Sequence, residues 1–141
     1  MATRSRIGLQ LADGAILSVY HHWDGYPEWL GVMLKKNYNT REKIAELLDG
    51  GDISCLASDT DWDRKECEPH VLYYNARGEN TAPRLDANVD DYFEAGEEYA
   101  YIFTLDHKWE CYALSHKYDD DFVVIQTNAV PDEIPSELPV D

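Results

Sequence analysis

Two residues near the start of the chain have the types and spacing for acid–base chemistry: His22 and Asp24, in the segment His-Trp-Asp-Gly-Tyr-Pro. A neighbouring Asp and His can act as acid and base, which makes a small hydrolase one hypothesis. However, no familiar nucleophile or metal-binding motif accompanies them. His21 and His22 should point to opposite faces of a strand, so they do not easily share a metal ion. The sequence therefore favours a protein that is not an enzyme, with Asp24 bonding backbone N–H groups in a turn.

A second pattern suggests calcium chemistry, because Asp59, Asp61 and Asp63 alternate as at the start of a calcium-binding loop. The rest of the pattern is missing. Arg64 stands where that loop needs Gly, and His70 stands where it needs a bidentate Glu. We interpret the segment as a solvated acidic loop and predict no metal and no cofactor.

A third group of residues could bind an anion. Arg4 and Arg6 share one face of an extended segment, and an Arg side chain can form a fork of hydrogen bonds with a phosphate. This makes a small-molecule binder, or a sponge for a phosphorylated nucleotide signal, the second hypothesis. The opposing interpretation is that these arginines pair internally with the acidic excess. The candidate ligand-binding residues are Arg4, Arg6, His22, Trp23, Asp24, Tyr26 and Arg77.

The charge of the chain is strongly acidic and unevenly distributed. The net charge is −16, yet residues 1–50 carry six basic and six acidic side chains, so the whole excess lies in residues 51–141. Such a field repels nucleic acid and anionic membranes and attracts basic partners. The simplest alternative is that the charge serves solubility alone.

The acidic residues form clusters that could bind a partner. Carboxylates on a rigid face can imitate the regular charge of duplex DNA, about one per 1.7 Å of axis, and so occupy a nucleic-acid-binding cleft. Aromatic residues between them, such as Trp62, Tyr92 and Phe93, could anchor an interface or lie in the core. The candidate partner-binding residues are Asp59, Asp61, Asp63, Glu66, Glu68, Asp90, Asp91, Glu94, Asp119, Asp120 and Asp121.

The elements that would position these groups predict an α+β fold. A mostly antiparallel sheet is expected from two hairpins, the first with its turn at Asp13-Gly14, with two main helices on one face. We expect one acidic domain over 1–128 and an acidic, Pro-rich tail over 129–141. Predicted strands span 7–11, 15–21, 53–57, 71–75, 99–105, 109–114 and 122–126. Predicted helices span 27–38, the segment from the cap at Asn39 to Gly50-Gly51, and 88–95; residues 77–88 are expected to be irregular.

Length and cysteine content bound the class of protein. The 141 residues suit one domain with a hydrophobic core. Three cysteines without CxxC spacing favour a reducing cytoplasm over a disulfide framework. We expect neither a signal peptide at the N-terminus nor a membrane span.

Two segments resemble a known group of sequences. Thr3-Arg-Ser-Arg-Ile-Gly8 and His22-Trp-Asp-Gly-Tyr-Pro27 are similar to motifs of a family of small uncharacterised tailed-phage proteins, frequent in phages of cyanobacteria. The segments 50–54 and 76–79 also resemble that family, and the likeness covers roughly residues 3–115. It implies a phage origin and expression in the cytoplasm of a bacterial host. The family has no established activity, so no site residue is carried over.

These observations lead to one leading hypothesis. The chain is expected to be a phage accessory protein that binds and inhibits a nucleic-acid-handling or defence factor of the host through its acidic, DNA-mimicking surface. The expected partner is a host protein with a basic surface. Direct contact with nucleic acid or membrane is not expected.

Overall fold

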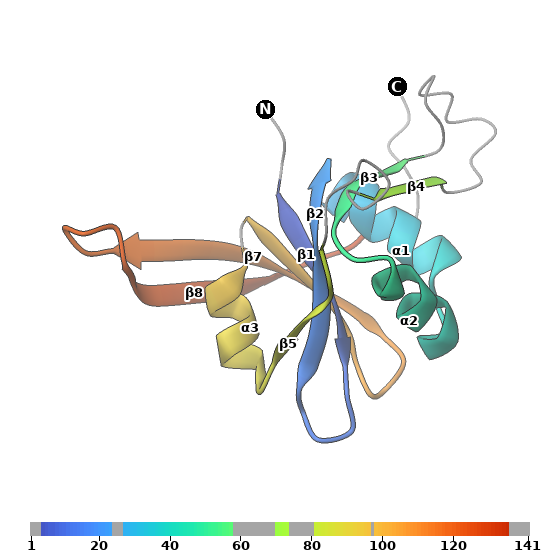
Figure 1. The fold of residues 1–141 in the computed structure, drawn as a ribbon, viewed down its shortest axis with the longest axis horizontal. Coiled ribbons are helices and arrows are strands. Elements are labelled where there is room, and N and C mark those ends of the chain that lie inside the picture. Colours follow the sequence, from blue (N-terminus) through green and yellow to red (C-terminus); the bar gives the residue numbers. More distant parts are fainter. Residues whose placement is uncertain (1–3, 24–26, 58–69, 74–80, 97, 136–141) are drawn as a thin grey trace.

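The computed structural model describes residues 4–23, 27–57, 70–73, 81–96 and 98–135, and it confirms the α+β class. Figure 1 shows helices on both sides of a strongly twisted sheet. The elements are β1 (Ser5–Gln10), β2 (Ile16–Trp23), the π-helix η1 (Pro27–Gly31), α1 (Val32–Asn37), α2 (Arg41–Asp49), β3 (Ile53–Ala57), β4 (His70–Tyr73), β5 (Arg84–Asp86), α3 (Val89–Ala95), β6 (Tyr99–Phe103), β7 (Trp109–Tyr118) and β8 (Val124–Asp132).

The strands form one sheet in the order β4-β3-β2-β1-β6-β7-β8, and β5 adds to β2 beside β3. Two of the pairings, β1 with β6 and β2 with β3, are parallel, and the others are antiparallel. The mostly antiparallel sheet and its two predicted hairpins are therefore confirmed. The short strand β5 differs from the sequence prediction, which gives irregular structure for residues 77–88.

The first hairpin follows the sequence prediction closely. Gly14 adopts a φ of 90°, which favours glycine over other residues. The Asp13 carboxylate accepts a hydrogen bond from the backbone N–H of Ala15 at 3.0 Å and so holds the turn. β1 and β2 then pair from Gln10 and Ile16 at the turn to Ser5 and His21.

One face of the sheet packs against η1, α1 and α2, as predicted for the two main helices. Ile7, Val19 and Phe103 from the strands meet Leu30, Leu34, Ile44 and Leu48 from the helices in one buried cluster. The predicted helix over 27–38 is confirmed, although it opens as a π-helix. The cap of α2 is one residue later than expected: Thr40, not Asn39, accepts the N–H of Lys43 at 3.2 Å.

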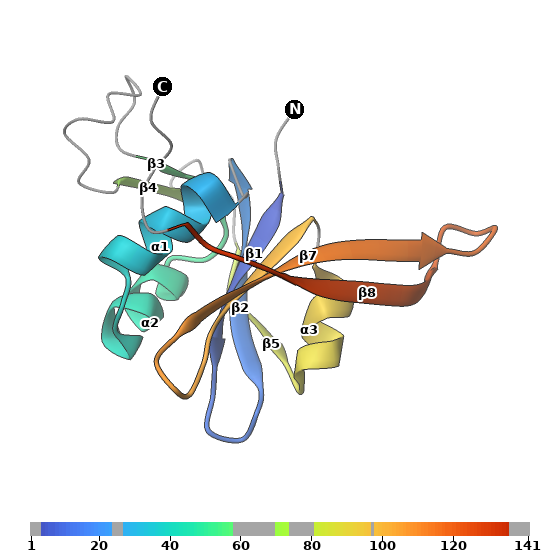
Figure 2. The same ribbon diagram turned by 180° about the vertical axis from the view of Figure 1, so that it is seen from behind.

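The opposite face packs against α3, as Figures 1 and 2 show from two sides. Tyr92 is fully buried there, and its hydroxyl donates to the carbonyl of Tyr101 at 2.7 Å. Burial raises the pKa of Tyr92 far above its usual range, so the phenol keeps its proton. Gly8 allows this approach, because a Cβ atom there would lie 3.0 Å from the Tyr92 ring.

The last two strands form a long hairpin that extends from the body of the molecule (Figure 1). Both are longer than predicted. The expected boundary between domain and tail at residue 128 is wrong, because β8 continues to Asp132 and Ile134 is buried in the main core. Pairing with β7, which continues to Pro131 and Asp132, outweighs the polar and Pro-rich composition of this segment. In the described part of the chain, no helix is long and apolar enough to cross a membrane.

Candidate interaction site on an acidic arm

The hairpin and the helix beside it concentrate negative charge in one part of the molecule. We call α3 together with residues 109–133 the acidic arm. It holds nine carboxylates and a single lysine, Lys117. The nine are Asp90, Asp91, Glu94, Glu110, Asp119, Asp120, Asp121, Asp132 and Glu133.

The three acidic residues of α3 are exposed because the rest of the helix is anchored. The Asn88 side chain caps the helix by accepting the N–H of Asp91 at 2.9 Å. Asp90 and Asp91 lie in the first turn, where the helix dipole favours negative charge. Tyr92 points into the core from the other side of the helix. The predicted residues Asp90, Asp91 and Glu94 are therefore left facing solvent.

A histidine fixes the end of α3 to the hairpin. His116 Nε2 lies 2.8 Å from the carbonyl oxygen of Gly96, and Nδ1 lies 2.9 Å from the hydroxyl of Thr127. A carbonyl only accepts, so Nε2 carries a proton; in the neutral ring Nδ1 then accepts from Thr127. Because His116 joins the helix to both strands, the carboxylates of α3 keep a fixed place relative to β8.

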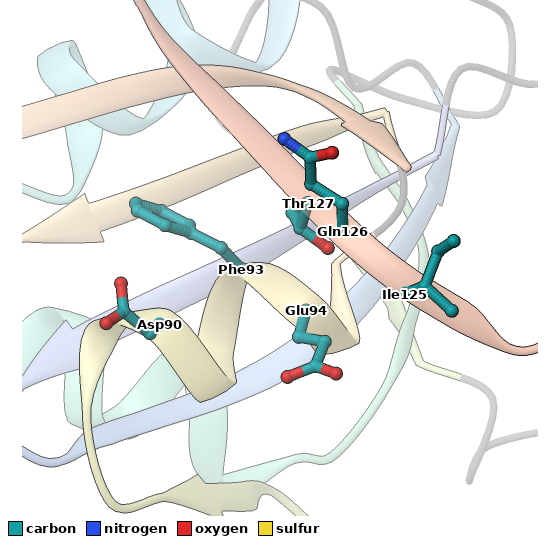
Figure 3. Close-up of a pocket in the computed structure, with 6 residues that line it drawn as sticks. All are labelled: Asp90, Phe93, Glu94, Ile125, Gln126 and Thr127. Carbon is teal, nitrogen blue, oxygen red and sulfur yellow. The ribbon is translucent and has the colours of Figure 1, made fainter. Parts of the chain in front are cut away.

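A small groove lies between α3 and β8 (Figure 3). Its volume is about 230 Å³, below the roughly 300–1,000 Å³ typical of small-molecule pockets. The side chains of Phe93 and Ile125 are apolar, while Asp90 and Glu94 carry charge. A Lys or Arg side chain suits such a groove, because its stem can pack on apolar surface while its head meets a carboxylate. The lining residues are Asp90, Phe93, Glu94, Ile125, Gln126 and Thr127.

A second groove, of about 450 Å³, lies near the other end of the hairpin. Glu110, Asp132 and Glu133 contribute to its lining, and Lys35 of α1 contributes the one lysine. Both described grooves are thus bordered by carboxylates of the acidic arm.

The tip of the hairpin carries the predicted cluster Asp119, Asp120 and Asp121. The Asp119 carboxylate is used within the turn, because it accepts the N–H of Asp121 at 2.8 Å and of Val123 at 3.0 Å. All three residues are exposed. The tip therefore holds a structural carboxylate and two further ones directed to solvent.

The predicted acidic clusters have different outcomes. The structure brings the cluster on α3 and the cluster at the hairpin tip onto the same arm (Figure 1). Asp59, Asp61, Asp63, Glu66 and Glu68 lie outside the described residues, as does the calcium-like loop.

Part of the alternative anion site is assembled on the same face of the sheet as α3, since Arg6 and Gly8 share one side of β1 and Gly8 faces Tyr92. Register places Arg6 opposite Tyr20. The Arg6 guanidinium donates to the Ser18 hydroxyl at 3.0 Å and to its carbonyl at 3.3 Å. Within the described part of the chain, Arg6 forms no ion pair with a carboxylate. Arg4 is exposed just before β1.

His22 lies in the same region, with its Nδ1 2.6 Å from the Tyr20 hydroxyl. Neither described groove is lined by His22, Arg4 or Arg6. The side chain of Trp23 and all of Asp24, Tyr26 and Arg77 lie outside the described residues. The structure therefore does not describe the proposed His22–Asp24 pair.

Two buried residues, His21 and Cys111, have side chains of reactive types, but their surroundings make them unreactive. Burial, together with neighbouring His22, lowers the pKa of His21 to about 3, so this imidazole is neutral near pH 7. Burial raises the pKa of the Cys111 thiol to about 12. A protonated, buried thiol is a poor nucleophile. Among the described residues, no group of three His, Cys, Asp or Glu side chains could hold a metal ion.

Some residues of the candidate site were missed by the sequence interpretation. Gln126 and Thr127 line the groove, but only their place beside Asp90 and Glu94 of α3 gives them that role, whereas Phe93 was already a possible interface anchor. Comparisons with protein-family models, curated protein sequences and solved structures give no match for this chain.

Proposed function

We propose that the chain is a non-catalytic accessory protein of a tailed phage that binds and inhibits a basic nucleic-acid-handling or defence protein in the cytoplasm of a bacterial host. The observation that carries this proposal is the acidic arm, which holds nine carboxylates and one lysine and has a groove, bordered by Asp90 and Glu94, that suits a basic side chain. In the DNA-mimicking form of the proposal, the arm occupies the partner's nucleic-acid cleft. The phage origin is supported by the resemblance of the two N-terminal motifs.

Several features favour a protein partner over other ligands. The groove between α3 and β8 is small for a metabolite and open at the surface, but it matches one side chain in size. Like charge opposes contact with nucleic acid or anionic lipid. The charge should speed association with a basic protein and make it sensitive to salt.

The experiment is a capture from host lysate followed by measurement with the purified partner. The wild-type chain should retain a basic protein at low salt and release it as salt rises. The double variant Asp90→Asn/Glu94→Gln should bind that partner at least tenfold more weakly, since both charges that border the groove are lost while its shape is kept. Glu46→Gln/Asp49→Asn on α2 removes the same charge far from the arm and is the matched control. Capture of no basic protein, or equal loss in both variants, would contradict the proposal.

The inhibitory part of the function needs its own measurement. The purified partner should lose binding to its nucleic acid when the wild-type chain is added, and recover it with Asp90→Asn/Glu94→Gln. Binding of chain and nucleic acid to the partner at the same time would show that the arm does not mimic DNA.

A small-molecule binder is the second candidate, favoured by the bonding of Arg6 to Ser18 instead of a carboxylate. Arg6 could then turn toward a phosphate beside Tyr20 and His22. Calorimetry with phosphorylated nucleotides tests this idea: binding by the wild type and its loss in Arg6→Ala would support it. If the wild type binds none of these nucleotides, the small-molecule candidate is rejected.

A further inference from the structure

The turn of the β7–β8 hairpin contains an unusual aromatic residue. Phe122 is 85% exposed and its backbone φ is 61°, a left-handed value that strains a bulky residue. The position is the one that glycine or asparagine normally fills after a type I hairpin turn. Among the described residues, the other non-glycine with positive φ is His107, whose ring packs on Phe103 at 5.7 Å.

Phe122 is not needed to form the turn. The turn is held by Asp119, whose carboxylate and backbone accept and donate the bonds that close it. The Phe122 side chain contributes no burial to the core, so the fold gains nothing from an aromatic ring here. A glycine would serve the backbone better.

Other exposed apolar residues lie close to Phe122 along the hairpin. Tyr118, Val123 and Ile125 are each more than half exposed and lie within four residues of Phe122. We call these four residues the tip patch. Asp119, Asp120 and Asp121 adjoin it on the turn, and Asp90 and Glu94 adjoin Ile125 across the groove. An apolar patch with an acidic border fits an apolar pocket with a basic border.

A second copy of the chain or a membrane would fit the acidic border of the tip patch poorly. A second copy of the chain would place the aspartates of two tips, or one tip and another acidic surface, against each other, which repels. A membrane would attract the ring, but three aspartates in the same turn oppose insertion next to anionic headgroups. An aromatic anchor in a protein pocket gains from burial and is common among the residues that dominate interfaces.

We propose that Phe122 is the anchor by which the hairpin tip docks into an apolar, basic-rimmed pocket of the partner protein. This inference rests on the proposed function and adds to it the point of contact and the chemistry of the pocket. The carboxylates then orient the tip and speed its approach, and the ring provides most of the lifetime of the complex.

The test uses Phe122→Gly in the full chain, with Leu85→Ser as the matched control because Leu85 is an exposed apolar residue on β5, outside the β7–β8 hairpin. Phe122→Gly relieves the backbone, so its Tm should rise by about 3 °C. Its affinity for the purified basic partner should fall about 30-fold or more, mainly through faster dissociation. Leu85→Ser should bind like the wild type. A variant that folds more stably yet binds less well cannot be explained by damage to the fold.

The outcomes separate the two proposals. If a basic partner binds the wild type and Phe122→Gly binds it equally, the proposal that Phe122 is the anchor is wrong, but the proposed function of the acidic arm is retained. If no basic protein binds the wild type, the proposed function fails and the anchor falls with it. Concentration-dependent dimers, or sedimentation with neutral phosphatidylcholine vesicles, that depend on Phe122 would overturn the protein pocket in favour of a second copy or a lipid surface.

Discussion

The hairpins β1–β2 and β7–β8 each turn through a residue in the left-handed backbone conformation. The first hairpin contributes to the core, whereas the outer part of the second is exposed. In β1–β2, the left-handed position is Gly14, and Ile7 and Val19 are fully buried between the sheet and its helices. In β7–β8, the left-handed position is Phe122, and the outer part of the hairpin is exposed. The first hairpin follows the rules of stable folding, whereas the second departs from them at its tip.

The difference shows that requirements other than stability act on the tip of the β7–β8 hairpin. Residues held in an unfavourable backbone conformation persist where the surroundings or a function require them. Because the body of the sheet supplies the stability, the projecting hairpin can carry an exposed ring and a dense set of carboxylates. The contrast predicts that substitutions in the two hairpins will have different, and in one case opposite, effects.

The largest contrast should come from shortening one isoleucine in each hairpin. Ile7→Ala removes fully buried atoms from the main core and should lower the free energy of unfolding by about 2–5 kcal/mol. Ile125→Ala, on the exposed part of β8, should change it by roughly 0.5 kcal/mol or less. Urea denaturation of the two variants measures both values. Equal losses would mean that the outer hairpin is as much a part of the core as β1.

The next effect is a pH dependence that arises from the first hairpin. The pKa of His21 is about 3 in the folded chain and 6.5 in the unfolded chain, so between these values the unfolded state binds a proton that the folded state excludes. The stability from neutral His21 is fully present above pH 6.5 and is lost as the pH falls. The loss is up to about 1.4 kcal/mol per pH unit, or roughly 2 kcal/mol at pH 5.

Comparison of wild type with His21→Gln isolates this contribution. Denaturation curves at pH 7.5 and 5 should show about 2 kcal/mol more loss in the wild type than in the variant, whatever the variant's stability at neutral pH. Parallel losses would mean that His21 is protonated or exposed in the folded chain.

The smallest effect compares the two turn positions directly. A Cβ atom on Gly14 would meet no other atom within 4 Å, so Gly14→Ala tests the backbone conformation alone. It should cost about 1 kcal/mol, whereas Phe122→Gly should stabilise the chain by a similar amount. Thermal unfolding measures both shifts. Shifts of the same sign would remove the argument that the two hairpins differ in purpose.

Much of the fold was predictable because local signals agreed with the final packing. Asp13-Gly14, the cap at Asn88 and the helical spacing after Pro27 each fixed an element without help from distant residues. β5 was not predictable in this way, since its three residues form a strand only by pairing with the middle of β2. The end of β8 was misjudged because Pro131 at its end is tolerated opposite Tyr112.

The candidate site was predictable in its charge but not in its geometry. Asp90, Glu94 and the Asp119–Asp121 run were identified as partner-binding candidates from clustering alone. That α3 and the hairpin would form one arm depends on contacts such as His116 with Gly96, which join residues 20 positions apart. The role proposed for Phe122 had no sequence signal, because its backbone conformation becomes visible only in three dimensions.

The place of β1 in the sheet has a consequence for how the molecule is made. β1 lies between β2, its neighbour in sequence, and β6, with Ser5 aligned to Tyr99 and Leu9 to Phe103. Pairs so distant along the chain slow the search for the native topology. During synthesis, β1 can pair with β2 early. Its other edge must stay unpaired until β6, which ends at residue 103, has left the ribosome.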